Sequence, residues 1–189
     1  KEPRGSLFRS MQIARRGWQQ RGLTATHSQG APGVMREVVG GTLLVTDDQV
    51  SAVLGKSLQG DRNWGRWAGR RLVGTAKHSI LMYEVYFPTY AAEKHSGSAW
   101  QTQLRLMRRL PESERAADPW HQALADLTMQ IINDLASKSA FTVDFTRIII
   151  TGDLNTKWLP GTGSGFSKTR TTSLRQFAAQ FGLSKVFSR

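Results

Sequence analysis

The chain has 189 residues, no cysteine, and 26 Lys plus Arg against 14 Asp plus Glu, which gives a net charge of +12. This length fits one domain with a real core, and the lack of cysteine excludes disulfides, cysteine catalysis and thiolate zinc sites. No apolar run approaches the ~18 residues of a membrane span, so none is predicted. The basic balance favours a polyanionic partner, and a generic basic surface is the alternative.

The N-terminal part of the sequence alternates between helical and irregular patterns. Apolar residues at helical spacing predict a short amphipathic helix over residues 6–17. Residues 27–36 are rich in Gly, Ser and Pro and predict a loop, and residues 42–46 predict a strand. The glycine-rich residues 55–70 again predict a turn or loop.

The central part predicts a hairpin followed by two helices. Residues 71–76 and 79–87 read as two strands joined by a tight turn. A helix is expected within residues 98–110, and a clearer one begins at Pro119, for which Asp118 is a suitable N-cap. One face of that helix carries large apolar side chains, namely Trp120, Leu124, Leu127, Ile131 and Leu135.

The C-terminal part predicts one strand and one helix. Residues 147–151 form a β-branched run typical of a central strand that is buried on both faces. Residues 160–172 predict a mobile loop, after which Thr172 or Ser173 would cap a helix that directs Leu174, Phe177, Ala178 and Phe181 inward. The alternation of strands and helices predicts an α/β or α+β fold with a mixed sheet, in a single domain spanning residues 1–189.

The strongest chemical signal follows the strand at residues 147–151. The turn Gly152-Asp153-Leu154-Asn155 places a carboxylate and an amide at alternate positions, which in an extended chain would face one side. Such a pair can hold a water and a phosphoryl oxygen beside a hard cation. The alternative is an Asx-type turn that simply closes the strand, because Gly, Asp and Asn are common turn residues.

Residues 149–155 resemble the Gly-Asp-(Phe/Leu)-Asn motif of the endonuclease/exonuclease/phosphatase superfamily, which includes DNase I-like nucleases, abasic-site endonucleases and the endonuclease domains of non-LTR retrotransposons. Four further segments resemble that family in the same order along the chain. They are the Gly-Gly strand start at 40–44, the Gly-Arg strand at 69–73, the Val-Tyr-x-Pro strand end at 85–89, and the final helix and strand at 174–187.

This resemblance implies a four-layer α/β sandwich of two mixed sheets and a Mg²⁺ (or Mn²⁺) cofactor. It makes Glu2 and Asp153 candidate metal ligands, with a solvated terminal glutamate as the alternative for Glu2. It gives Asp153, Asn155 and Tyr86 catalytic roles: Asp153 at the attacking water or a second ion, and the other two at the phosphate. For Tyr86 the alternative is an aromatic side chain that packs on a strand.

Basic side chains supply the candidate nucleic-acid contacts. Arg70, Lys168 and Arg170 are assigned to this role. The arginines at 105, 108 and 109 would form either a phosphate track or, more simply, a solvated helix face.

The function implied by the resemblance is Mg²⁺-dependent hydrolysis of phosphodiester bonds in nucleic acid, DNA before RNA, inside the cell in nucleus or cytoplasm. The family's first metal-site strand and final Ser-Asp-His motif have no counterpart in the sequence. A domain truncated at both ends, with weak or no activity, is therefore expected. Two alternatives remain: a phosphoinositide or other phosphoester phosphatase of the same superfamily, and a nucleic-acid-binding remnant without activity.

Overall fold

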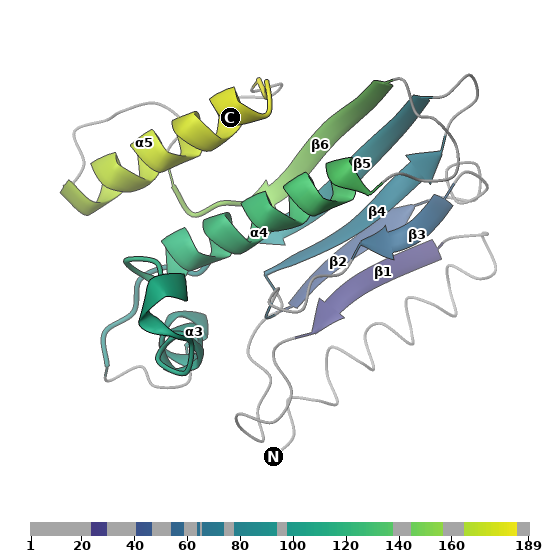
Figure 1. Cartoon of the computed structure of the whole chain (residues 1–189). Coiled ribbons are helices and arrows are strands. Elements are labelled where there is room, and N and C mark those ends of the chain that lie inside the picture. Colours follow the sequence, from purple (N-terminus) through teal and green to yellow (C-terminus); the bar gives the residue numbers. More distant parts are fainter. Residues whose placement is uncertain are drawn as a thin grey trace, which may run out of the picture.

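The computed structural model describes residues 24–29, 41–46, 54–58, 64, 66–73, 78–93, 98–137, 145–156 and 165–184 (Figure 1). Its strands are β1 (Thr24–Gln29), β2 (Gly41–Thr46), β3 (Leu54–Leu58), β4 (Trp67–Val73), β5 (His78–Tyr86) and β6 (Phe145–Asp153). Its helices are α3 (Ala99–Met107), the short 3-10 helix Glu112–Glu114, α4 (Pro119–Ala136) and α5 (Gly165–Gln180). The predicted helix at 6–17 lies outside the described residues.

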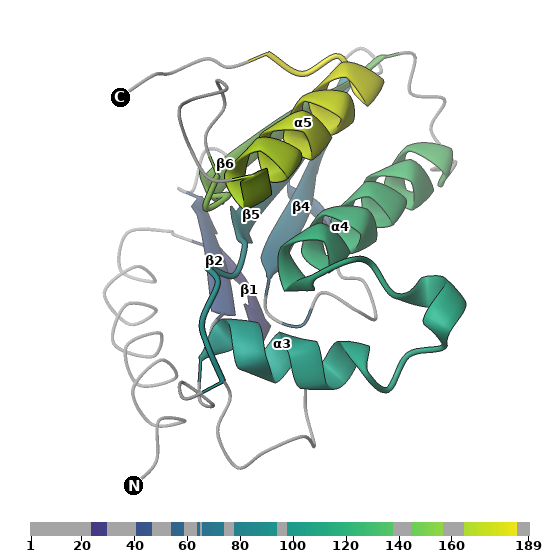
Figure 2. The same cartoon turned by 90° about the vertical axis from the view of Figure 1, so that its left-hand side faces the viewer.

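The described strands form two sheets, and the fold is mixed α/β as the sequence predicts. The larger has the order β3-β4-β5-β6, in which β3, β4 and β5 pair antiparallel and β5 and β6 pair parallel. The smaller is the antiparallel pair β1-β2. Figures 1 and 2 show α4 and α5 over one face of the larger sheet, whereas β1 and β2 approach β4 and β5 from the other side.

The predicted hairpin and the helix expected within residues 98–110 are confirmed. β4 and β5 pair in register from Trp67 with Val85 to Val73 with Ser79. α3 is capped by Ser98, whose hydroxyl accepts the backbone N–H of Gln101 at 3.2 Å.

Asp118 caps α4 as predicted, since its Oδ1 accepts the backbone N–H of Trp120 at 2.8 Å and that of His121 at 2.9 Å. The inward face of α4 is as predicted except at its end, where Leu135 is 44% exposed. Asp134 is buried there instead, because its carboxylate accepts the Tyr83 hydroxyl at 2.5 Å.

Three loop predictions are wrong in part. β1 occupies residues 24–29, β3 and β4 occupy much of 55–70, and α5 begins at Gly165 rather than at Thr172. In each case the local composition is typical of turns, but long-range contacts decide the structure. The strands gain neighbours in a sheet, and α5 is anchored on the core by Leu174 and Phe177, both buried as predicted.

β6 differs from the predicted central strand. It is the end strand of the described four-stranded sheet, and the described helices α4 and α5 lie over one face of that sheet (Figure 2). Ile148 and Ile150 pack against the core, whereas Ile149 between them is 41% exposed. The continuous β-branched run could not distinguish these two faces, since strand side chains alternate.

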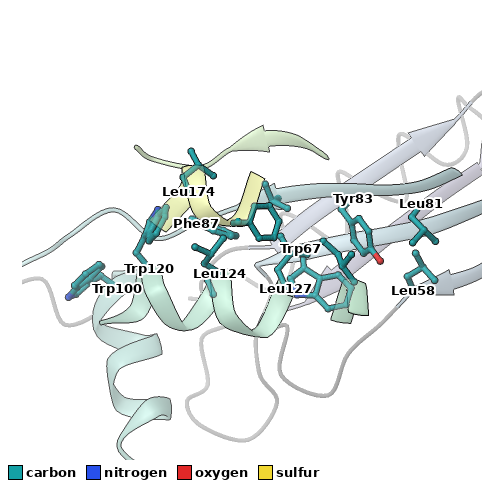
Figure 3. Close-up of a cluster of buried hydrophobic side chains, with 14 residues drawn as sticks. Leu58, Trp67, Leu81, Tyr83, Phe87, Trp100, Trp120, Leu124, Leu127 and Leu174 are labelled. Atoms are coloured by element: carbon teal, nitrogen blue, oxygen red, sulfur yellow. The ribbon is translucent and has the colours of Figure 1, made fainter. Parts of the chain in front are cut away.

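The core lies between the larger sheet and the helices (Figure 3). Alternate side chains of β5 point into it, and Trp67 packs edge-on against Tyr83 with ring centroids 5.9 Å apart. Beyond the end of β5, Phe87 packs edge-on against Trp120 at 5.5 Å. This second contact fixes the carboxyl end of β5 against α4.

Candidate active site

Tyr86 and Asp153 are neighbours at one edge of the larger sheet. They are register partners at the carboxyl ends of the parallel strands β5 and β6. The buried side chains of β5 alternate with Met82, Glu84 and Tyr86, so Tyr86 lies on the face turned away from α4. In a parallel sheet, directly paired residues share a face, which puts the exposed Asp153 beside the half-buried Tyr86.

The chain turns immediately after Asp153. Asn155 has a positive φ of 47°, and its backbone N–H donates to Oδ1 of Asp153 at 2.8 Å. This is the Asx-type turn, so Asp153 and Asn155 are not two alternate positions of an extended strand as predicted. The short polar side chain of Asn makes such a backbone conformation accessible.

The same turn is tied to the end of β5. The Asn155 side chain donates from Nδ2 to the carbonyl of Phe87 at 2.6 Å, and the Phe87 N–H donates to the Asp153 carbonyl at 2.9 Å. Gly152 has a φ of 113°, and a Cβ there would lie 2.1 Å from the Val85 carbonyl oxygen. The sequence-predicted Asp153, Asn155 and Tyr86 are therefore brought together by backbone geometry.

Glu84 adds a carboxylate that the sequence prediction missed. It lies two residues before Tyr86 on the same face, and its carboxylate accepts a hydrogen bond from the Thr151 hydroxyl. The period-2 alternation of Glu84-Val85-Tyr86 was the signal that would have revealed it.

The oxygen atoms at this edge are of the type that binds a hard cation, but they do not form a complete set of ligands among the described residues. In the part of the chain that the structure describes, no three or more His, Cys, Asp and Glu side chains form a group that could hold a metal ion. Mg²⁺ takes oxygen ligands, usually one or two carboxylates together with several waters. Asp153, the carbonyl oxygen of the Asn155 side chain and the nearby Glu84 are of that kind, and Glu2 lies outside the described residues.

Arg66 is a second residue that the sequence prediction missed. Its side chain is buried, with its guanidinium carbon 5.7 Å from the centre of the Tyr86 ring. Its carbonyl accepts the Tyr86 N–H at 2.8 Å, and its Nε donates to the Trp64 carbonyl at 3.2 Å. Burial lowers the pKa of the Arg66 guanidinium to about 10, partly offset by Tyr86. A positive charge thus lies beside Tyr86.

The predicted nucleic-acid contacts are dispersed. Arg70 pairs with Met82, four positions from Tyr86, which corresponds to roughly 13 Å along a strand. Lys168 is exposed on α5. Arg170 is only 5% exposed and lies between Trp100 and Trp120, which corrects its predicted role as a surface contact.

Comparison with models of known protein families, with curated proteins and with solved structures finds no match for this chain. Among the described helices, none combines the length and the apolar character that crossing a bilayer requires. The fold and the site define the chain as a mixed α/β protein with a polar cluster at the carboxyl ends of two parallel strands.

Proposed function

We propose that this chain is a Mg²⁺-dependent phosphodiesterase of the endonuclease/exonuclease/phosphatase (DNase I-like) class that acts on nucleic acid. The observation that carries the proposal is the register of β5 and β6, which pairs Tyr86 with Asp153. The two residues belong to motifs more than sixty positions apart in the sequence, Val-Tyr-x-Pro and Gly-Asp-Leu-Asn. Their meeting at one sheet edge is what the resemblance requires.

The proposal extends to the architecture. The order of layers is helices α4 and α5, then the four-stranded sheet, then β1-β2 (Figure 2). We propose that the two sheets are the inner layers of a four-layer sandwich. The candidate site would then lie at the rim between the sheets, because Tyr86 and Asp153 occupy the face turned towards β1-β2.

The residues present suit the chemistry of phosphodiester hydrolysis. A divalent ion, when bound, supplies Lewis-acid stabilisation of charge on phosphoryl oxygens and acidifies water. Asp153 keeps Oδ2 outside its turn and can orient a water or hold an ion. The Tyr86 hydroxyl can donate to a phosphate oxygen, and the Arg66 guanidinium places positive charge nearby. These groups need little reorganisation, since the Asn155 to Phe87 bond fixes the edge.

Charge supports nucleic acid as the substrate class within this proposal. The net charge is +12, and Arg108, Arg109, Lys168 and Arg175 are exposed on the helical side. Lys and Arg side chains neutralise backbone phosphates without reading bases. A long polyanion engages dispersed charges of this kind better than a single phosphorylated headgroup does.

A second candidate function is nucleic-acid binding without hydrolysis. One observation favours it: Oδ1 of Asp153 is engaged by the Asn155 backbone N–H at 2.8 Å. That contact reduces the oxygen donors that Asp153 offers to an ion. Binding would then depend on the basic charge alone, and substitution of Asp153 would leave it unchanged.

Plasmid nicking separates the two candidates. Supercoiled DNA is incubated with the protein in Mg²⁺ and, separately, in EDTA, and the relaxed form is quantified. The phosphodiesterase proposal predicts weak relaxation in Mg²⁺ that D153N and Y86F abolish, whereas the exposed E112Q on the 3-10 helix is a neutral control. DNA binding without Mg²⁺-dependent relaxation, and without calorimetric Mn²⁺ binding that D153N weakens, supports the second candidate and contradicts the first.

A further inference from the structure

A buried tryptophan contacts the turn that carries the candidate site. Trp120 lies in the first turn of α4, is 0% exposed, and donates from its indole Nε1 to the Leu154 carbonyl at 2.6 Å. Leu154 is the residue between Asp153 and Asn155. Trp120 itself lies on the helix side of the sheet and does not belong to the polar cluster at the strand ends (Figure 3).

The contact acts on a single rigid group. The carbonyl of Leu154 and the N–H of Asn155 belong to the same planar peptide unit and point in opposite directions. The indole of Trp120 binds the carbonyl end, and Oδ1 of Asp153 binds the N–H end at 2.8 Å. Rotation of this peptide plane would therefore move the acceptor position of the Asp153 carboxylate.

The indole ring is itself held by a residue of α5. The guanidinium carbon of Arg170 lies 5.5 Å from the Trp120 ring centre and 5.0 Å from that of Trp100 in α3. Arg170 also approaches Oδ2 of Asp118 at 3.9 Å, and Asp118 caps the helix that carries Trp120. Burial lowers the pKa of Arg170, opposed by Asp118. The guanidinium of Arg170 thus joins α5 to the tryptophans of α3 and α4.

We propose that Trp120 is a positioning residue that orients the Asp153 carboxylate through the Leu154–Asn155 peptide, and that Arg170 holds the Trp120 ring for this purpose. An effect of this orientation on divalent-ion binding rests on the proposed function. The effect of Trp120 on the conformation of the turn does not rest on it. Outer residues that fix a ligand in this way commonly change metal affinity by about 10-fold to 100-fold.

The substitution W120F tests the proposal, since it removes the indole N–H and keeps a buried aromatic ring. Two quantities are measured: the hydrogen-exchange rate of the Asn155 backbone amide by NMR, and Mn²⁺ affinity by calorimetry. We expect several-fold faster exchange and a Mn²⁺ affinity weakened about 10-fold. W100F is the matched control, because it keeps an aromatic face for Arg170 and lies on α3, outside the helix that carries Trp120; both quantities should stay at the wild-type values.

Wild-type Asn155 exchange in folded W120F would overturn the proposal. If the wild type binds no Mn²⁺, the proposed function fails, and the exchange comparison still decides the positioning role. If W120F does not fold, R170M carries the test, since it removes the guanidinium from the ring without altering the turn. Faster Asn155 exchange in R170M supports the proposal, and unchanged exchange contradicts it.

Discussion

The side chain of Asn155 joins the ends of two strands, because its Nδ2 donates to the Phe87 carbonyl at 2.6 Å. Phe87 follows β5 directly, and Asn155 follows β6. The bond thus holds together the two strand ends that present Tyr86 and Asp153. Phe87 is buried, so the bond also supplies a hydrogen-bond donor to a carbonyl group in the protein interior.

Replacement of Asn155 by Ala should destabilise the protein by about 1–3 kcal/mol, because a buried carbonyl loses its donor and Ala tolerates the positive φ of 47° poorly. N155D should also destabilise, since a carboxylate cannot donate to Phe87. Urea unfolding measures both changes, with N133A on the exposed face of α4 as control. Equal stability of N155A and the wild type would show that the bond does not hold the strand ends.

Gly152 should tolerate no side chain. A Cβ at this position would lie 2.1 Å from the Val85 carbonyl oxygen, and the φ of 113° adds strain. G152A should therefore lower the unfolding free energy by more than about 3 kcal/mol. The matched control is G182A, which has a φ of 63° with open space around the Cβ and should cost about 1–2 kcal/mol. Similar losses in the two variants would refute the close packing of β5 and β6 at Gly152.

Tyr83 should make stability depend on pH in the alkaline range. Burial, together with the hydrogen bond to Asp134, raises the pKa of the Tyr83 phenol above its ordinary value of 10.0. Above about pH 10 the folded state therefore binds more protons than the unfolded state, so stability falls as pH rises. The unfolding free energy of Y83F should fall less steeply above about pH 10, because the variant lacks this phenol.

At neutral pH, Y83F should be less stable by about 1.5–3 kcal/mol, since Asp134 loses a donor. Urea unfolding of wild type and Y83F at several pH values measures both effects. The buried Arg66 is common to both proteins, so its own titration cancels in the comparison. Parallel pH profiles for the two proteins would contradict the raised pKa.

Binding to duplex DNA should weaken steeply with salt. Each neutralised phosphate contributes a slope of roughly −0.9 in log K against log salt. Several arginine and lysine side chains that contact one DNA strand should therefore give a total slope of about −3 to −6. Fluorescence anisotropy across a salt series measures the slope, with anionic lipid vesicles as competitor. R108Q and R109Q should each reduce its magnitude by about 1. A flat response, or displacement of DNA at low lipid, would refute nucleic acid as the partner.

The sequence predicts the part of the site that depends on strand ends. Pro88 limits β5, and the Gly-Asp pair ends the β-branched run of β6, so the positions of Tyr86 and Asp153 at strand ends follow from local chemistry. The resemblance gave both residues catalytic roles, but their direct pairing is seen in the register of β5 and β6.

The contributions of Arg66 and Trp120 to the site depend on long-range contacts. Arg66 meets Tyr86 only through the hairpin, and Trp120 meets Leu154 only after α4 packs on the sheet. Turn-like composition also concealed β3 and the first half of α5. Sheet pairing and core burial override such local preferences, which explains these errors.

Paramagnetic broadening by Mn²⁺ tests whether a divalent ion binds beside Asp153 and Tyr86. Amide NMR spectra are recorded during addition of less than one equivalent of Mn²⁺, which broadens nearby signals. The account predicts early, selective loss of the signals of Tyr86, Asp153 and Asn155, whereas Gly182 beyond α5 stays sharp. D153A should abolish this selectivity. Uniform broadening in the wild type, or selective broadening elsewhere, would contradict binding of the ion beside these residues.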